Sequence, residues 1–182
     1  MSLKHILLGF INIQSMTGYE LKQLIDNSIN NFWNVNLSQI YPTLGAMKEE
    51  ELLDMEIQIN EGTPNSKIYN ITEKGRIELE KWMEETTPLP QTRKLFLAKL
   101  LVGVKFDKEI LIKQVKEQLK LHQMALESLY KRLAGNTCNL PTTEDPEKYK
   151  LFTELVIDAG IKEEEASIAW CMQTIERLEK SN

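Results

Sequence analysis

The sequence has few of the residues that build disulfide networks or metal sites. Only two of its 182 residues are cysteines, Cys138 and Cys171, and only two are histidines, His5 and His122. Two cysteines cannot form a disulfide framework, so the composition favours a reducing compartment and predicts a cytoplasmic protein. The histidines are far apart and match no metal-ligand spacing, so we expect no zinc or other metal site.

Long apolar runs and flexible residues are also scarce. The apolar stretch at residues 3–13 is interrupted by Lys4, His5 and Asn12. Nothing approaches the roughly 18 apolar residues that a membrane span needs, so we expect no membrane contact. No signal peptide or lipid-attachment motif is visible. Eight glycines and six prolines are too few for a disordered or collagen-like chain.

Motifs of enzyme active sites are missing as well. The sequence has no GxSxG, no HExxH and no glycine-rich phosphate loop. It has two runs of carboxylates, at residues 49–51 and 163–165, but helical spacing would spread each run around a helix and mostly into water. We therefore predict that the protein is not an enzyme and needs no cofactor.

Patterned segments fill the first half of the chain. Residues 3–14 have helical apolar spacing, and Thr17 with Glu20 predicts a capping box at the start of a second helix. A third helix is expected from Leu37 or Ser38. Its buried face would consist of apolar residues at helical spacing: Leu37, Ile40, Leu44 and Met47.

The pattern then changes from helical to strand-like. Apolar and polar residues alternate strictly over 53–60, which predicts a half-buried strand, and residues 61–66 have turn composition. Residues 67–71 form the expected return strand, and Thr72 the N-cap of a helix that runs to about residue 83. Three helices, a hairpin and a helix are the order of a winged helix-turn-helix.

A domain boundary is predicted where Pro88 and Pro90 interrupt helical structure. The expected fold class is mainly α with a small β-hairpin wing. Residues 1–87 would form a winged helix-turn-helix DNA-binding domain, and residues 91–182 an all-helical dimerisation domain.

Two long helices, at about 107–134 and 147–180, dominate this second domain. Each has an apolar seam with 3-4 spacing. We expect the two seams to build a homodimer, although they could instead pack only within one chain. The seam residues predicted to dimerise are Leu119, His122, Leu126, Leu129, Ile161, Ile168, Ile175 and Leu178.

The third helix is the candidate recognition helix. Hydrogen-bonding residues cluster at its start, where helix-turn-helix proteins contact base edges, although ordinary capping and surface chemistry would use the same residues. Lysines here and at the wing would contact phosphates. The predicted DNA-binding residues are Asn36, Ser38, Gln39, Tyr41, Thr43 and Lys48 on the helix, and Asn65, Ser66 and Lys67 on the wing.

The charge balance argues against strong DNA binding. The chain has a net charge of −5. Residues 1–90 contain seven lysines and arginines against thirteen aspartates and glutamates. A DNA-binding domain usually has a basic surface, so the phosphate contribution to affinity should be small.

Four motifs in the first half resemble the PadR family of bacterial transcription regulators: ILLGF at 6–10, MTGYEL at 16–21, SQIYPTL at 38–44 and KIYNITEKGR at 67–76. The second half is similar to the helical C-terminal domain of longer PadR members and AphA-type virulence activators. Many members of the family have glycine where this chain has Glu51. The resemblance implies a homodimer that binds a two-fold symmetric double-stranded DNA operator, usually as a repressor. Some relatives respond to small aromatic or amphipathic ligands.

Two functions remain open at this point. The first is a dimeric DNA-binding repressor that a small-molecule effector releases from its operator. The alternative is a winged-helix protein-interaction module with weak or no DNA binding, which the acidic first half would suit.

Overall fold

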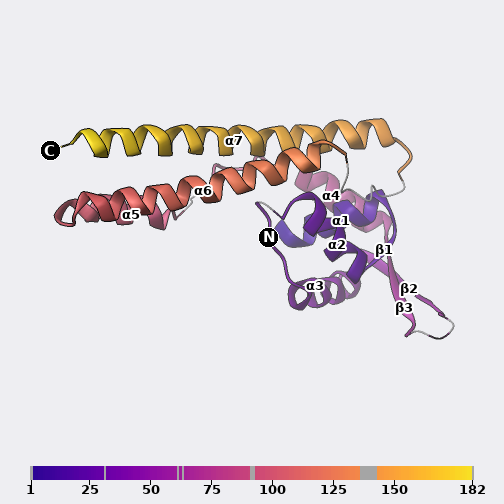
Figure 1. Cartoon of the computed structure of the whole chain (residues 1–182). Coiled ribbons are helices and arrows are strands. Elements are labelled where there is room, and N and C mark those ends of the chain that lie inside the picture. The colour runs from indigo at the N-terminus through magenta and orange to yellow at the C-terminus, as the bar shows by residue number, and fades with distance from the viewer. Residues whose placement is uncertain are drawn as a thin grey trace. The chain divides into compact units, whose positions relative to one another are not determined.

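The computed structural model describes residues 2–30, 32–60, 62, 64–90, 93–135 and 143–181 (Figure 1). The chain divides into two compact units. The first consists of Met1–Thr87 with Thr137–Lys150, and the second of Pro88–Asn136 with Leu151–Asn182. The domain limits predicted at residues 87 and 91 stay a prediction, and Cys138 lies outside the described residues.

Up to Thr87, the described residues of the first unit form four helices and a small sheet. Its helices are α1 (Ser2–Ile13), α2 (Gly18–Ser28), α3 (Leu37–Glu49) and α4 (Glu73–Glu84). Its strands are β1 (Met16–Thr17), β2 (Leu53–Gln58) and β3 (Ser66–Ile71). The sheet is antiparallel in the order β1-β3-β2. The predicted two-stranded hairpin therefore has a third strand, because Met16 and Thr17 pair with β3 before α2 begins.

The predicted capping box at Thr17 is confirmed. The Thr17 N–H donates to Glu20 Oε2 at 2.7 Å, and the Glu20 N–H donates to the Thr17 hydroxyl at 3.2 Å. These two bonds satisfy backbone donors that the first turn of α2 would otherwise leave unpaired. The Thr72 cap is also confirmed, since its hydroxyl accepts from the Gly75 N–H at 3.0 Å at the start of α4.

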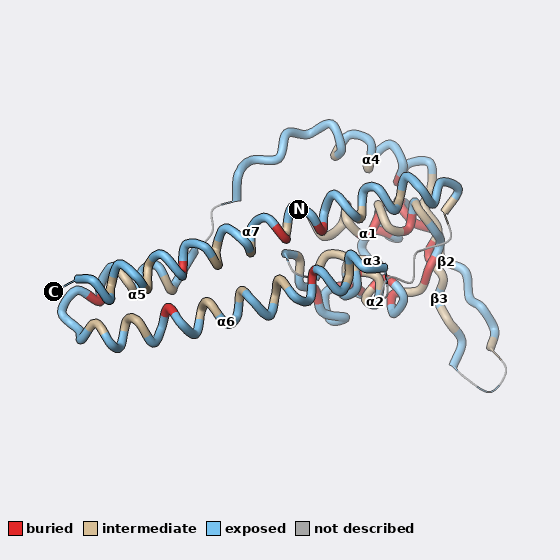
Figure 2. Tube along the Cα trace, turned by 45° about the horizontal axis from the view of Figure 1, so that its top comes forward, coloured by how far each residue is buried: buried red, intermediate tan, exposed pale blue. Residues whose placement is uncertain are grey.

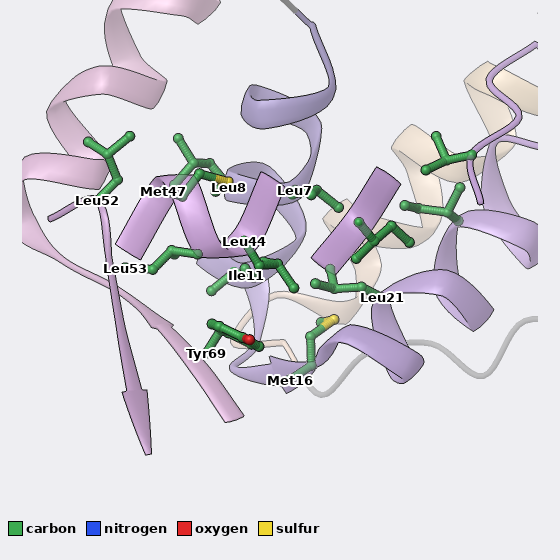
Figure 3. Close-up of a cluster of buried hydrophobic side chains, with 13 residues drawn as sticks. Leu7, Leu8, Ile11, Met16, Leu21, Leu44, Met47, Leu52, Leu53 and Tyr69 are labelled. Carbon is green, nitrogen blue, oxygen red and sulfur yellow. The ribbon is translucent and has the colours of Figure 1, made fainter. Parts of the chain in front are cut away.

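A single apolar core joins α1, α2, α3 and the sheet (Figure 3). Leu7, Leu21 and Leu44, one from each of the three helices, are fully buried. Tyr69 of β3 and Leu53 of β2 attach the hairpin to this core. Burial at about 25 cal/mol per Å² of apolar surface makes this cluster the main stabilising feature of the unit. The apolar core therefore holds α3 and the base of the hairpin in fixed positions relative to each other.

The hairpin extends beyond this core. Leu53 is buried and Met55 is half-buried, but Ile57 is 60% exposed and Ile59 is 81% exposed. The expectation of a half-buried strand over eight residues is therefore wrong for its second half. The reason is that the helices reach only the base of the hairpin, so its far half projects into solvent as a wing (Figures 1 and 2).

The described residues of the second unit lie mainly in three α-helices. They are α5 (Leu95–Val102), α6 (Lys108–Leu133) and α7 (Pro146–Lys180), and the short 3-10 helix η1 (Gly103–Lys105) joins α5 to α6. Of these helices, α7 begins within the residues assigned to the first unit. The two long helices are those expected from the seams, with ends that differ by at most one residue. Figure 2 shows α6 and α7 as an extended pair in which few positions are buried.

The two seams face each other within one chain. Leu129 of α6 packs in a buried cluster with Ile157 and Ile161 of α7, and Leu126 packs against this cluster. His122 Nδ1 lies 2.6 Å from Glu164 Oε2 in the same interface. The polar seam positions His122 and Glu164 are therefore paired with each other. The role of the eight seam residues in dimerisation stays a prediction.

Two further properties concern the described residues alone. None of their helices combines the length and apolar character that a membrane span requires. Within the same residues, no three or more His, Cys, Asp or Glu side chains are grouped as metal ligands would be.

Candidate nucleic-acid interface

The start of α3 is a helix N-terminus with exposed polar side chains. Asn36 is the N-cap residue, with extended backbone (φ −102°, ψ 155°), and Ser38, Gln39 and Tyr41 are exposed. The buried face of α3 (Ile40, Leu44 and Met47) holds the helix on the core. The opposite face of α3 is exposed, and its contact with DNA stays a prediction.

Gln39 has a structural role in this helix start. The backbone N–H of Asn36 donates to Gln39 Oε1 at 3.1 Å, so the side-chain oxygen of Gln39 caps the helix. A bidentate contact with adenine needs both the oxygen and the nitrogen of this amide. Gln39 would have to give up its capping bond to make such a contact. Thr43 is also engaged, because its hydroxyl donates to the Gln39 carbonyl at 2.7 Å.

The wing presents its charges on two different faces. In the β2–β3 register, Ile57 pairs with Lys67 and Met55 with Tyr69, whereas Glu56 pairs with Ile68. Directly paired residues share a face and neighbours along a strand alternate. Lys67 therefore lies on the face of buried Tyr69, towards the helices. Glu56 lies on the opposite face.

The end of the wing is held by Asn60. Its side-chain amide donates to the Pro64 carbonyl and to the Ser66 hydroxyl, both at 2.9 Å. Its backbone N–H donates to Asn65 Oδ1 at 3.3 Å. The side chains of Asn65 and Ser66, predicted to contact DNA, thus also shape the wing turn.

A concave surface of about 860 Å³ lies between the wing, α3 and the start of α2. It brings together Tyr41 from α3 and Asn65, Ser66 and Lys67 from the wing. The other predicted DNA-binding residues, all on or just before α3, do not line it: Asn36, Ser38, Gln39, Thr43 and Lys48.

Several residues of this surface are not among those predicted from the sequence, and they include Tyr19 and Gln58, whose polar side chains are exposed. Tyr19 is 57% exposed in the first turn of α2, and Gln58 ends β2. The motif around Tyr19 predicts a helix cap and belongs to the PadR resemblance, but neither interpretation identifies Tyr19 as part of a contact surface. Gln58 gave no signal, because it alternates with apolar residues like any outward-facing strand residue.

Two tyrosines lie close together at the base of this surface. Burial raises the pKa of Tyr69, and the neighbouring Tyr41 raises it further. Tyr41 itself is 47% exposed, so its ring is available at the surface.

Some lysine and arginine side chains of this unit are held by ion pairs or hydrogen bonds, and others are not. Lys74 pairs with Glu51 at 3.0 Å, Arg76 donates to Asn12 Oδ1 at 2.8 Å, and Lys4 pairs with Glu78 at 2.8 Å. Lys48 and Lys67 are exposed and have no ion pair within the part of the chain that the structure describes. These two lysines are therefore available for phosphates, and of the two Lys67 lines the concave surface.

Glu51 follows α3 in an unusual backbone conformation. Its φ is +60°, and among the described residues it is the single non-glycine residue with positive φ. L-residues other than glycine adopt this region at a cost of about 1–2 kcal/mol. Its carbonyl accepts from the Thr72 hydroxyl at 2.7 Å, which ties the turn after α3 to the start of α4.

Two family models cover most of the chain. Residues 7–81 match the transcriptional regulator PadR-like family, and residues 92–179 match the C-terminal domain of virulence activator alpha. The probable transcriptional regulator Rv1176c of Mycobacterium tuberculosis is 30% identical over 99% of both chains. The negative transcriptional regulator PadR of Bacillus subtilis is 24% identical over 98% of both.

Solved structures share the fold over the whole chain. Bacillus subtilis PadR in complex with operator DNA has a TM-score of 0.84 at 21% identity, covering 98% of this chain and 99% of that one. PadR in complex with p-coumaric acid has a TM-score of 0.76 at 21% identity, covering 98% and 96%. The Vibrio cholerae virulence activator AphA has a TM-score of 0.77 at 23% identity, covering 97% and 98%.

The resemblance found in the four sequence motifs is thus confirmed, and so is the mainly helical fold with a winged helix-turn-helix. In helix-turn-helix proteins the second helix of the motif enters the major groove, and α3 has that position in this chain's helix order. The chain belongs to the PadR-like family of transcriptional regulators.

Proposed function

We propose that the protein is a homodimeric DNA-binding repressor that a small aromatic or amphipathic effector releases from its operator. The observation that carries DNA binding is the concave surface that joins Tyr41 of α3 to Lys67 of the wing. The start of α3 enters a major groove and Lys67 contacts a phosphate beside it. In a two-fold symmetric dimer, the two copies of α3 read half-sites about 34 Å apart or a multiple of that distance.

The charge distribution supports this proposal over a protein-interaction module. The unit is acidic overall, but Asp54 and Glu56 lie on the face of the wing opposite Lys67. Glu50 and Glu51 are paired with Lys4 and Lys74. These four acids therefore reduce the positive electrostatic potential at Lys67 less than their number suggests. We expect a modest affinity for DNA that depends only weakly on salt concentration.

Relatives support repression and an effector. The relative from Bacillus subtilis is named a negative transcriptional regulator, and its structures include complexes with operator DNA and with p-coumaric acid. A ligand releases DNA only if it binds the DNA-free conformation more tightly than the DNA-bound one. We infer the same relation between operator and effector for this chain.

Dimerisation draws support from an apolar surface at the α5 end of the second unit. Large exposed apolar patches mark interfaces between proteins. Besides the seam residues predicted from the sequence, we assign to the dimer interface the exposed apolar residues from α5 to the start of α6: Leu95, Leu101, Val102, Val104, Phe106 and Ile110, which are 49–84% exposed.

The test of DNA binding is fluorescence anisotropy with the duplex upstream of the protein's own gene and a scrambled duplex, at two salt concentrations. We expect tighter binding to the upstream duplex. Lys67→Ala should weaken binding to both duplexes and reduce the salt slope by about 1. Lys81→Ala is the matched control, because Lys81 is an exposed lysine on α4 that does not line the concave surface. No binding to either duplex at low salt would support the protein-interaction module instead.

A further inference from the structure

The wing carries two large apolar side chains in solvent. Ile57, near the end of β2, is 60% exposed, and Ile59, directly after β2, is 81% exposed. They are two positions apart on an extended chain, so they lie on the same face of the hairpin. A single exposed apolar residue is ordinary, but neighbouring ones on a projecting hairpin indicate a contact surface (Figure 2).

This face of the wing has a positive charge and no acid from either strand. Ile57 pairs directly with Lys67 in the β2–β3 register, so their side chains are neighbours. The acids of the two strands, Asp54 and Glu56, lie on the opposite face. We call the face formed by Ile57, Ile59 and Lys67 the apolar wing face. Apolar side chains beside a cation suit a partner with anionic groups outside and flat bases within, as DNA has.

The apolar wing face adjoins the concave surface that is proposed to hold DNA. Lys67 belongs to both, because it lines the concave surface and pairs with Ile57. Gln58, which stands between the two isoleucines in the chain, also lines the concave surface. A duplex bound there lies within reach of the isoleucines. DNA, rather than a second copy of the chain, is therefore the occupant that this position favours.

Three hydrogen bonds restrain the backbone just after Ile59. The side-chain amide of Asn60 donates to the Pro64 carbonyl and to the Ser66 hydroxyl, both at 2.9 Å. The backbone N–H of Asn60 donates to Asn65 Oδ1 at 3.3 Å. These bonds tie the residue after Ile59 to the start of β3, so less conformational freedom is lost when Ile59 contacts a partner.

Apolar side chains can enter the minor groove of DNA as wedges. An isoleucine inserted between two base pairs unstacks them and bends the duplex by about 20–90°. Pyrimidine–purine steps (TA and CA/TG) open most easily, so such a wedge also selects the sequence. The contact needs no phosphate charge. It therefore suits a chain in which residues 1–90 contain seven basic and thirteen acidic side chains.

We propose that Ile59, with Ile57 beside it, inserts into the minor groove at a pyrimidine–purine step next to the half-site of α3 and bends the operator. Ile59 is then a specificity-determining residue, and Lys67 neutralises a phosphate that flanks the opened step. This inference rests on the proposed function, because it applies only if the protein binds DNA.

The test uses full-length protein, the duplex upstream of its own gene, and permanganate. Permanganate oxidises thymines that have lost their stacking, so it detects an opened step wherever that step lies in the duplex. We expect protein-dependent reactivity at thymines of pyrimidine–purine steps, at two positions related by the symmetry of the operator. Energy transfer between dyes at the two ends of the duplex should increase, because bending brings the ends together.

Variants separate the wedge from the charge of the wing. Ile59→Ser should weaken binding to the upstream duplex about tenfold and abolish both the permanganate signal and the bend. Its salt dependence should equal that of the wild type because no charge changes, whereas Lys67→Ala lowers it. Ile59→Met keeps an apolar wedge and should retain the affinity and the signal.

Met83→Ser is the matched control. Met83 is 71% exposed on α4, outside the wing, so this variant should bind and bend the duplex like the wild type. Ile59→Ser, Ile59→Met and Met83→Ser should all unfold at the urea concentration of the wild type, because the replaced side chains are exposed.

The other outcomes overturn the proposal in distinguishable ways. If Ile59→Ser leaves the affinity or the permanganate signal unchanged, the wedge is wrong while the proposed function stands. Wild-type binding without permanganate reactivity would also contradict the wedge, because the bases would then remain stacked. Weaker self-association of Ile59→Ser in sedimentation equilibrium would show that a second copy covers the apolar wing face. If the wild type binds no duplex, the proposed function fails and this inference fails with it.

Discussion

Gly18, the first residue of α2, lies directly under the ring of Tyr41 on α3. A Cβ atom at Gly18 would come within 2.6 Å of Tyr41 Cε1 and 3.0 Å of Cζ. Real side chains do not tolerate such distances, so the missing side chain of Gly18 sets the position of this ring. Because Tyr41 lines the concave surface facing the wing, α2 shapes the part of that surface that α3 contributes.

Gly18→Ala should therefore reduce DNA affinity more than it reduces stability. The ring of Tyr41 can swing away from the new methyl group, which leaves the core intact but disturbs the concave surface. In a double-mutant cycle with Tyr41→Ala, we expect a coupling of about 0.5–3 kcal/mol in DNA binding, because the alanine at position 41 removes the clash. Anisotropy titrations of the four proteins measure it.

Gly9→Ala serves as the control for Gly18→Ala. A Cβ at Gly9 would meet its nearest neighbour, Leu79 Cδ1, at 4.0 Å, an ordinary contact. Alanine is favoured over glycine within a helix by about 0.5–1 kcal/mol, so this variant should be slightly more stable and bind DNA normally. Equal DNA binding by both glycine variants would show that Gly18 does not position Tyr41.

Gln39 allows capping and base recognition to be separated. Gln39→Ala removes the bond to the Asn36 N–H, so the free energy of unfolding should fall by about 0.5–1 kcal/mol. Gln39→Glu keeps an acceptor at the third helical position and places a negative charge at the helix start, so stability should be retained. Gln39→Glu also removes the side-chain N–H donor and would place a carboxylate near the phosphates of DNA.

Urea unfolding and operator titrations of both variants distinguish the two roles of Gln39. If Gln39 contacts DNA, Gln39→Glu should bind poorly despite its normal stability. If Gln39 acts only as a cap, the glutamate variant should retain DNA affinity, and only the alanine variant should show a change in stability.

The predictable features depend on local chemistry. The capping box of Thr17 and Glu20 needs only residues three positions apart, and both of its bonds form. The family pattern also directed attention to Glu51, where the structure has φ +60°. Both features follow from backbone geometry over a few residues, which the sequence encodes directly.

The features missed from the sequence depend on tertiary placement. The alternation that includes Ile57 does not reveal that the helices end beside Met55 and leave Ile57 exposed. The sequence shows that Gln39 is polar, but not whether its amide faces DNA or its own helix start. The contact of Gly18 with Tyr41 joins two helices, and no periodicity within either one indicates it.

Glu51→Gly should stabilise the protein. Glycine adopts φ +60° without steric cost, so the gain should be about 1 kcal/mol in the free energy of unfolding. The ion pair with Lys74 that the substitution removes lies on the surface, where such pairs contribute little. Lys74→Ala removes the same pair without changing the backbone at Glu51, and it should shift stability by less than about 0.5 kcal/mol. Thermal unfolding of both variants measures the difference.

Stability should fall at acidic pH through Glu78, which joins α4 to α1. Hydrogen bonds from Lys4 and then from His5 lower the pKa of Glu78 below its ordinary value of 4.5. A carboxyl group with a lowered pKa in the folded state contributes stability above its unfolded pKa and loses it as the pH falls through the folded pKa. The contribution should stay below about 1 kcal/mol, because Glu78 is partly exposed.

Urea unfolding of the wild type and Glu78→Gln over pH 3 to 5 tests this contribution. The variant should be less stable at neutral pH and lose less stability on acidification. Glu80→Gln, on the same helix, is the control, since no ion pair of Glu80 is found in the described part of the chain. If the wild type and Glu78→Gln lost the same free energy of unfolding on acidification, the proposed contribution of Glu78 would be contradicted.

The last prediction concerns the apolar surface from α5 to the start of α6. Leu101 and Val104 are 80% and 84% exposed in a single chain. Apolar side chains buried in a dimer contribute about 1.5–3 kcal/mol each relative to exposure, so a charge at either position should oppose association strongly. Leu101→Glu and Val104→Glu should each weaken the dimer at least about tenfold without unfolding the monomer.

Met83→Glu is the control for these two variants. It changes a 71% exposed residue of α4 and should leave association unchanged. Sedimentation equilibrium measures the dissociation constants of the wild type and the three variants. Values for Leu101→Glu and Val104→Glu equal to that of the wild type would place the interface elsewhere on the helical unit.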